Sequence, residues 1–500
     1  MKLIKLATCI ATASLLAACG GDTKTKTVTV EVTPERNYIT PAAGSIAFDL
    51  ENAKKVLITN ADIAFSAYSD SVTTAIALKD ALGALQATPT ADTLKAAKAA
   101  WLVAREPYGQ TEVYRFRNSP IDDNPTTAAE EDGPEGSLNA WPLGEALIDY
   151  VATNESDFTA EQVGVITSNT GVNSGGIVDG SDTNQNIIAM TAIDINDALL
   201  DGSASAEDEH DVIAGYHAIE FLLWGQDLNT DVNLADRTTD GTDRDSAVNA
   251  TSMGGQRPLA DFVSISANDA ADRRHLYLQV AVDKLIAELT SVRDEWNKNT
   301  AGSYYNTFTT VANEAEAKVK LTEILVGMGT LSEGELAGER MQIAFTANSQ
   351  EDEHSCFSDN THRDIWLNAE GVSNSYTGTY AGYDDNQDGN DNVTTNAVTG
   401  YGIEDYLKDA EQIDLANQAK EVFAETEANY IEIDDDARYA AKPFDVQIMN
   451  PTVNNPVYKT IKSLNVQSVV IQNIATGLGL SNVVDGGASD CDTTNPLAGC

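Results

Sequence analysis

His217 and Glu220 are the residues of this sequence whose types and spacing most directly suggest chemistry. They lie three positions apart in GYHAIEFLLWGQD, residues 215–227, a run that is otherwise mostly apolar. A helix advances by about 100° per residue, so residues three apart share a face, and an unpaired charge in apolar surroundings is costly. The pair is therefore either two ligands of a buried metal ion or a hydrogen-bonded polar pair in a core. Taken alone, the motif favours the polar pair.

The spacing of this motif differs from that of the common zinc peptidases. His-Glu-x-x-His would need Glu at 218 and His at 221, where the chain has Ala218 and Phe221, and the inverted motif also fails at Phe221. A zinc or iron site needs at least three protein ligands. Distant parts of the chain must therefore supply the others.

Three further stretches contain candidate polar residues. In chain order these are Arg105, Glu112 and Arg115 among aromatic residues of a predicted helix, then Trp141, Glu145 and Asp149 within 135–150, then His354, Asp359 and His362 within 339–364. Each can also be a surface charge, a helix cap or part of a loop network. A fourth stretch, Asp384 to Gly389, matches the first half of a calcium loop, but Thr395 stands where the bidentate Glu belongs. We therefore interpret that stretch first as an acidic loop.

Composition limits the classes of partner. The chain has 500 residues and a formal net charge of -46, with 77 acidic and 31 basic residues. We do not expect nucleic acid as a partner, because phosphate binding needs clustered Lys and Arg. A cation is the more natural ligand, although a solvated acidic surface also explains such a charge.

The N-terminus has the pattern of a bacterial lipoprotein signal. Lys2 and Lys5 precede a short apolar stretch, and Cys19 follows small residues. We expect a signal peptide over 1–18, a lipidated Cys19 and a tether over 19–45, with a plain signal peptide as the alternative. Gly20 is not an inner-membrane retention Asp, so the outer membrane is favoured. The mature protein would then be held at a membrane surface of the cell envelope by its acyl chains.

Two cysteines at the C-terminus suggest a disulfide. Cys491 and Cys500 flank a short loop, and an exported protein meets an oxidising compartment. The sequence favours neither a Cys491–Cys500 disulfide nor two free thiols over the other. Cys356 is expected to be a small buried residue.

Helical periodicity dominates the sequence. Apolar residues recur at three- and four-residue spacing over 52–82, 93–116, 272–298 and 315–331, and a last helix is expected near 452–482. Alternating strand patterns are scarce, so we predict an all-α fold. Long polar loops separate the helices, and 227–257 is the best candidate for a hinge. The division we expect is a helical-bundle domain over 46–240, a second over 255–485, and a tail over 486–500.

The combination of these blocks resembles the imelysin family, which includes the iron-regulated protein A group. The similarity rests on GYHAIEFLLWGQD, which matches the family's G-x-H-x-x-E motif, and on LNAWPLGEALIDY, GELAGERM and EDEHSCFSDNTHRD. Membership would imply two four-helix-bundle-like domains, a motif cleft near their junction, and a cell-envelope lipoprotein linked to iron supply. His217 and Glu220 would carry over as the motif pair. Glu112, Arg115, Asp359 and His362 lie in blocks similar to the family's.

Three functions compete at this stage. The first is a metal-binding protein of iron uptake, in which His217, Glu220, Asp359 and His362 hold iron or zinc without an organic cofactor. The second is a metallopeptidase with Glu112 or another carboxylate as general base, and with Arg115 as the other predicted catalytic residue. The third is a scaffold that binds a peptide or protein and no metal.

Overall fold

The computed structural model of the chain describes the greater part of its length. The described residues are 37–123, 133–150, 165–168, 171–173, 186–201, 212–225, 254–255, 257–350, 352–440, 442–480, 483 and 491–500. The predicted signal peptide, Cys19 and most of the predicted tether lie outside them. So does most of the expected hinge, 227–257.

The described residues form a mostly helical protein, which confirms the predicted all-α class. The longer helices are α1 (Leu50–Ala87), α2 (Ala91–Gly109), α6 (Gly215–Trp224), α8 (Ala270–Glu295), α10 (Glu314–Thr330), α12 (Thr361–Thr377), α14 (Ile413–Tyr439) and α16 (Pro456–Leu478). The shorter ones are η1 (Glu112–Tyr114), α3 (Glu135–Leu138), α4 (Glu145–Ile148), α5 (Asp197–Asp201), η6 (Leu259–Phe262), α9 (Tyr304–Thr309), α11 (Ala344–Ala347), α13 (Ile403–Asp409) and α15 (Phe444–Ile448). A π-helical segment, η7 (Leu331–Ile343), joins α10 to α11.

Capping side chains fix where the predicted helices begin. The Asp49 carboxylate accepts the backbone N–H of Asn52 at the start of α1, and Asp269 does the same for Asp272 at the start of α8. Thr90 and Thr93 form a reciprocal capping box at the start of α2. These helices begin within two residues of the predicted starts. The predicted helix 93–116 ends early, because α2 stops at Gly109 and the short η1 follows.

Strands are a minor part of the described residues. Strand β1 (Val165–Ser168) pairs antiparallel with β2 (Gly171–Asn173), with Val165 opposite Asn173. Strand β3 (Thr379–Tyr380) pairs antiparallel with β4 (Val398–Thr399), with Tyr380 opposite Val398. The second pair closes the loop that contains the acidic stretch Asp384–Gly389.

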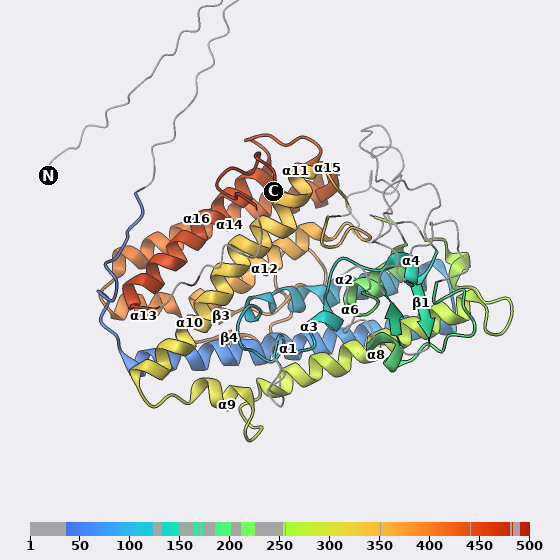
Figure 1. Ribbon diagram of the computed structural model, residues 1–500, viewed down its shortest axis with the longest axis horizontal. Helices are drawn as coiled ribbons and strands as arrows, with labels where there is room; N and C mark the ends of the chain where they lie inside the picture. The colour runs from blue at the N-terminus through green and yellow to red at the C-terminus, as the bar shows by residue number, and fades with distance from the viewer. Residues whose placement is uncertain are drawn as a thin grey trace, which may run out of the picture. The chain divides into compact units, whose positions relative to one another are not determined.

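The helices pack in two neighbouring groups (Figure 1). Helix α1 packs along α2 and α8, and α6 packs between α2 and α8. Helix α14 packs along α16, and α12 and η7 cover them; a shared core there includes Leu336, Phe345, Ile365, Ile433 and Leu464. Helices α2 and α12 join the groups. Contacts gather Ile39–Cys500 into one compact unit. The predicted division into domains 46–240 and 255–485 stays a prediction. Helix α8 belongs to the second of these ranges and packs on α1 and α6 of the first.

Close packing of α2 on α12 depends on a glycine. A Cβ at Gly109 would lie 2.6 Å from the Leu367 Cβ, closer than side chains tolerate. A similar approach occurs where η1 meets α10, because a Cβ at Gly327 would lie 2.3 Å from the Val113 carbonyl oxygen. The end of α2 and the segment after it are therefore held firmly between α10 and α12.

Cys491 and Cys500 form a disulfide at the C-terminus. The tail that it closes rests on η7 and α16, since Gln342 Nε2 donates to the Asp492 carbonyl and Lys462 Nζ to that of Thr494. Cys356 is buried, as expected.

Within the described residues, no helix is both long and apolar enough to cross a membrane.

Candidate functional site

The motif helix α6 is buried over its whole length, and its first glycine is required by the backbone. All ten of its residues, from Gly215 to Trp224, are buried. Gly215 has φ +84°, and a Cβ there would lie 2.5 Å from the carbonyl oxygen of Leu138 on α3. Only glycine fits such a conformation and such an approach without strain. The glycine of G-x-H-x-x-E thus lets α6 start against α3.

His217 and Glu220 bind each other at the centre of this helix. The Nδ1 atom of His217 lies 2.9 Å from Oε2 of Glu220. The other oxygen of Glu220, Oε1, accepts hydrogen bonds from the backbone N–H of Ser358 at 2.9 Å and from its hydroxyl at 2.6 Å. Both carboxylate oxygens are thus engaged. The sequence predicts that His217 and Glu220 bind one ion together, whereas this arrangement uses Glu220 to hold the imidazole.

Burial controls the charge of both groups. It raises the pKa of the Glu220 carboxyl to about 8, against the opposing hydrogen bonds from Ser358. It lowers the pKa of the His217 imidazole well below 6.5, so the ring is neutral. One ring nitrogen of a neutral imidazole carries a proton and the other a lone pair.

The second ring nitrogen of His217 is an orphan. Its Nε2 atom is buried and has no hydrogen-bond partner among the described residues. Two rings pack edge-on against the imidazole, Trp141 with centroids 5.0 Å apart and His354 with centroids 4.8 Å apart. Buried polar atoms are normally satisfied, so an orphaned nitrogen indicates a functional role.

His354 belongs to a hydrogen-bonded network beside the motif. Its Nδ1 lies 3.0 Å from Oδ2 of Asp364, and its Nε2 lies 3.3 Å from Nδ2 of Asn139. Asp364 also accepts the Arg105 guanidinium at 3.0 and 3.2 Å and the Ser355 hydroxyl. Burial lowers the pKa of His354 to about 4. For Asp364, Arg105 and His354 outweigh burial and hold the carboxyl pKa well below its usual range.

Glu112, which forms the predicted catalytic pair with Arg115, is linked to His354 through Asn139. Glu112 Oε2 accepts Arg340 Nη2 at 2.9 Å and Arg115 Nη1 at 3.4 Å, and its Oε1 accepts Asn139 Nδ2 at 3.4 Å. Burial would raise the pKa of Glu112, but Arg340 and Arg115 outweigh it and lower that pKa to about 2. A carboxylate held so strongly in its charged form is a weak base.

The contacts of His362 lead away from the motif. His362 Nδ1 donates to the Asp359 carbonyl at 2.9 Å, and its Nε2 lies 3.8 Å from Asp434 Oδ1 on α14. Asp359 has φ +57°, which turns the chain directly after Ser358. His362 is buried, and this lowers its pKa to about 4. The structure therefore gathers His217, Glu220, His354 and Glu112 near Asn139, with His362 facing α14.

Among the described residues, no three His, Cys, Asp or Glu side chains are grouped to hold an ion. The Nε2 atom of His217 fits the part of one ligand, because metal-binding histidines commonly donate their other N–H to a carboxylate, as Glu220 permits. In the acidic stretch, Asp384 accepts the backbone N–H groups of Asn386 and Gly389.

Sequence reasoning overlooked four contributors to the site. They are Asn139, Ser358, Asp364 and Arg340, and all four are buried. Asn139, Ser358 and Asp364 stand in the stretches singled out above, and Arg340 stands in GELAGERM. Their position inside these blocks was the available signal. Which of the polar residues in each block would face His217 depends on packing between segments far apart in the sequence, as Glu220 and Ser358 are, 138 residues from each other.

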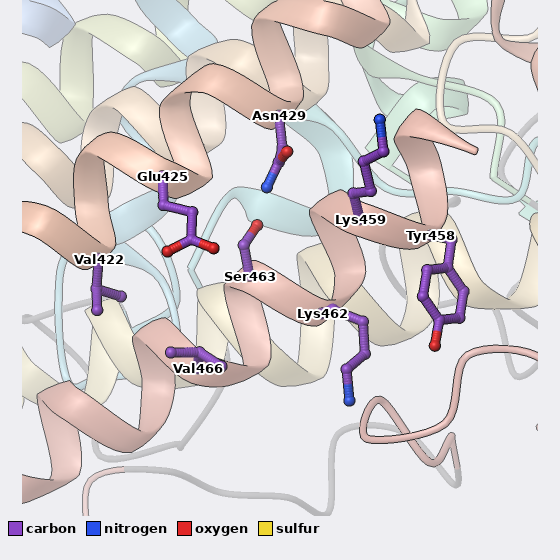
Figure 2. A pocket seen from close by; sticks show the side chains of 8 residues that line it. All are labelled: Val422, Glu425, Asn429, Tyr458, Lys459, Lys462, Ser463 and Val466. Carbon is purple, nitrogen blue, oxygen red and sulfur yellow. The ribbon is translucent and has the colours of Figure 1, made fainter. Parts of the chain in front are cut away.

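A groove separate from the motif lies between α14 and α16 (Figure 2). It encloses about 320 Å³, and its lining residues are Val422, Glu425, Asn429, Tyr458, Lys459, Lys462, Ser463 and Val466. Lys459 Nζ lies 2.9 Å from the Glu432 carboxylate, and Lys462 binds the C-terminal tail. None of the predicted site residues lines it.

The chain matches one protein-family model and resembles solved structures. The family model described as Imelysin (Peptidase_M75) matches residues 64–471. A solved iron-regulated protein A precursor from Parabacteroides distasonis ATCC 8503 is 14% identical, with a TM-score of 0.49, over 88% of this chain and 96% of that one. An imelysin-like protein from Psychrobacter arcticum 273-4 is 14% identical, with a TM-score of 0.49, over 87% of this chain and 98% of that one. The search of curated proteins gave no match.

Proposed function

Because the chain belongs to the imelysin family, we propose that it is a cell-envelope protein that binds a metal cation, iron foremost, through His217 of the G-x-H-x-x-E motif. The metal is the cargo of the protein in this proposal. It serves iron supply, and the motif provides one imidazole ligand of the ion. The other ligands are not assigned.

The orphaned Nε2 of His217 is the observation that carries the proposal. A buried nitrogen without a hydrogen bond is costly unless a ligand uses it. Glu220 Oε2 faces the other nitrogen at 2.9 Å, and Ser358 fixes the carboxylate through Oε1. Because the pKa of Glu220 is about 8, its carboxyl is protonated at neutral pH. When it gives up this proton, Nδ1–H of His217 donates to the Glu220 carboxylate and Nε2 presents a lone pair. This is the tautomer that a metal ion requires.

The surroundings favour iron as the first metal to test. Carboxylates from several elements lie beyond His354, and oxygen ligands with one or two imidazoles suit iron. Zinc accepts imidazole as readily, so it is the comparison metal. The net charge of -46 favours a cation over an anion as ligand.

Lipid anchoring completes the proposal. The N-terminal pattern that ends at Cys19 supports attachment to the outer membrane by acyl chains, as predicted above. Replacing Cys19 by Ser should move the protein from the membrane fraction to the soluble fraction of the envelope. A Cys19→Ser protein that stays with the membrane would contradict the anchor.

Metal binding is tested on the mature chain in detergent. Anaerobic titration with Fe²⁺, and separately with Zn²⁺, should give about one tight equivalent for the wild type and none for His217→Ala. The matched control is His275→Ala, which removes another buried histidine whose Nε2 binds the Phe262 carbonyl at 2.9 Å. Thermal melts verify that each variant folds. Equal metal content in the wild type and His217→Ala would overturn the proposal.

The metallopeptidase alternative has less support. Its expected base, Glu112, has a pKa near 2, far from the neutral range in which a general base works best. If the protein is a peptidase, unfolded polypeptides should be cleaved and a chelator should stop the cleavage. The scaffold alternative predicts neither cleavage nor metal.

A further inference from the structure

One of the side chains that contact His217 is partly exposed. The imidazole lies against Glu220, His354 and Trp141, and the first two of these are buried, with 0% and 5% exposure. Trp141 is only half-buried. Its indole ring packs edge-on against the imidazole, with ring centroids 5.0 Å apart. Of these three neighbours, Trp141 is therefore the one that faces both His217 and solvent.

The two buried neighbours are fixed by hydrogen bonds. Glu220 accepts the backbone N–H of Ser358 at 2.9 Å and its hydroxyl at 2.6 Å. His354 contacts Asp364 through Nδ1 at 3.0 Å and Asn139 through Nε2 at 3.3 Å. Moving either side chain would break bonds in a buried site, where water does not replace them. Neither side chain therefore provides a path to the orphaned nitrogen.

Trp141 is held by ring contacts that can break without stranding a polar group. Besides the contact with His217, its ring packs edge-on against Phe357, with centroids 5.5 Å apart. Phe357 in turn packs on Phe221 of α6, with centroids 5.2 Å apart. Such aromatic pairs are favourable, but they bind no donor or acceptor that must be replaced when the ring moves. The closed position is thus stable and still reversible.

The backbone on both sides of Trp141 is anchored. Asn139 is buried, and its amide belongs to the hydrogen-bonded network described above. The N–H of Gly144 donates to the carbonyl of Val212 at 2.8 Å. Residues 140–142, between these anchors, are all partly exposed. Rotation of one side chain toward solvent, with the ends of the stretch fixed, is therefore enough to uncover the imidazole.

We propose that Trp141 is a gate to the motif: its ring shields Nε2 of His217 from solvent, and its rotation outward admits the ligand of that nitrogen. As far as the ligand is a metal ion, this inference rests on the proposed function. Because a single side chain moves between fixed ends, the opening suits a small ion rather than a folded polypeptide. When the ring closes again it keeps water from the bound ion, which strengthens the attraction between the ion and its ligands.

Chemical access to His217 tests the gate without any metal. The probe is diethyl pyrocarbonate, which modifies neutral imidazoles, applied to the mature chain in detergent at neutral pH and measured for each histidine by peptide mass spectrometry. His217 should react at least about tenfold faster in Trp141→Ala than in the wild type, because the shielding ring is gone. The matched control is Trp366→Ala, which removes another partly buried tryptophan, packed on Tyr430 of α14, and should leave the His217 rate unchanged.

His362 reports folding in the same samples. It is as buried as His217 and lies away from the gate, so it should react slowly in every folded variant. A wild-type rate at His217 in folded Trp141→Ala would overturn the gate. If both histidines become reactive, that variant has unfolded, and Trp141→Phe decides by the same comparison. Its smaller ring should speed the reaction of His217 and leave that of His362 unchanged, and equal His217 rates in Trp141→Phe and the wild type would refute the gate.

Release of Fe²⁺ connects the gate to the proposed function. A strong chromogenic chelator added to anaerobically loaded protein should withdraw Fe²⁺ at least about tenfold faster from Trp141→Ala than from the wild type or Trp366→Ala. Equal release rates would overturn the gate for the ion and leave the proposed function standing. A wild type that binds no Fe²⁺, with His217 still shielded by Trp141 in the chemical test, would overturn the proposed function and leave the gate.

Discussion

Nδ1 of His217 lies 2.9 Å from Oε2 of Glu220, and this contact gives the two residues of the motif different roles. Glu220 is fixed on its other side by two hydrogen bonds from Ser358, 138 residues further along the chain. The carboxylate therefore couples the motif helix to the loop before α12. The imidazole is oriented by this coupling, and its Nε2 remains available.

Replacing Glu220 by Ala should weaken metal binding without abolishing it. Loss of the orienting carboxylate typically lowers metal affinity about 10- to 100-fold. Two buried donors of Ser358 would also lose their acceptor, which costs about 1–3 kcal/mol of unfolding free energy each when nothing replaces it. Calorimetric titration and urea unfolding measure the two effects. Ser358→Ala, which removes only the hydroxyl donor, is the milder control. Wild-type affinity in Glu220→Ala would show that the carboxylate does not position His217.

Replacing Gly215 by Ala should destabilise the protein by at least about 2 kcal/mol, because the new Cβ would meet the Leu138 carbonyl in a left-handed backbone conformation. Gly83→Ala on α1 is the matched control. Gly83 has no neighbouring atom within 4 Å of an added Cβ and lies within a helix, so this change should stabilise by up to about 1 kcal/mol. Urea unfolding distinguishes the two. Equal effects would mean that the motif glycine is not a steric requirement.

Local pattern was sufficient to predict the helices and insufficient to predict the site. The period of apolar residues over 52–82 and 272–298 located α1 and α8, since burying one face of a helix is a property of the local sequence. The π-helical form of η7 leaves the apolar pattern of GELAGERM unchanged, so it could not be foreseen.

The partners of the motif are set by tertiary packing. His362 and His354 stand in the same stretch, and the sequence offered no reason to choose between them. In the structure His354 lies at the motif, because α12 directs His362 toward Asp434 on α14. Residue type therefore identified the candidates, and only the fold could select among them.

Acid should destabilise the wild type more than His362→Gln. Burial lowers the pKa of His362 from 6.5 to about 4, so in the folded state this ring is neutral where the unfolded chain would be protonated. Stability associated with the neutral ring is therefore present above pH 6.5 and is lost as the pH falls from 6.5 toward 4. At pH 5 the loss amounts to about 2 kcal/mol. Urea unfolding of both proteins at pH 7 and pH 5 should show this difference. Parallel losses in both proteins would contradict a buried neutral His362.

Replacing Arg115 by Gln should make the protein less stable. The change removes a positive charge that lies within 4 Å of Glu112, Asp122, Glu135 and Glu335. At such distances one charge contributes about 1 kcal/mol or more per partner, so the free energy of unfolding should fall by at least about 1 kcal/mol. Urea unfolding at pH 7 measures this loss. Arg115→Lys, which keeps the charge, should lose less stability than Arg115→Gln. If the two variants are equally stable, the charge of Arg115 does not hold these carboxylates together.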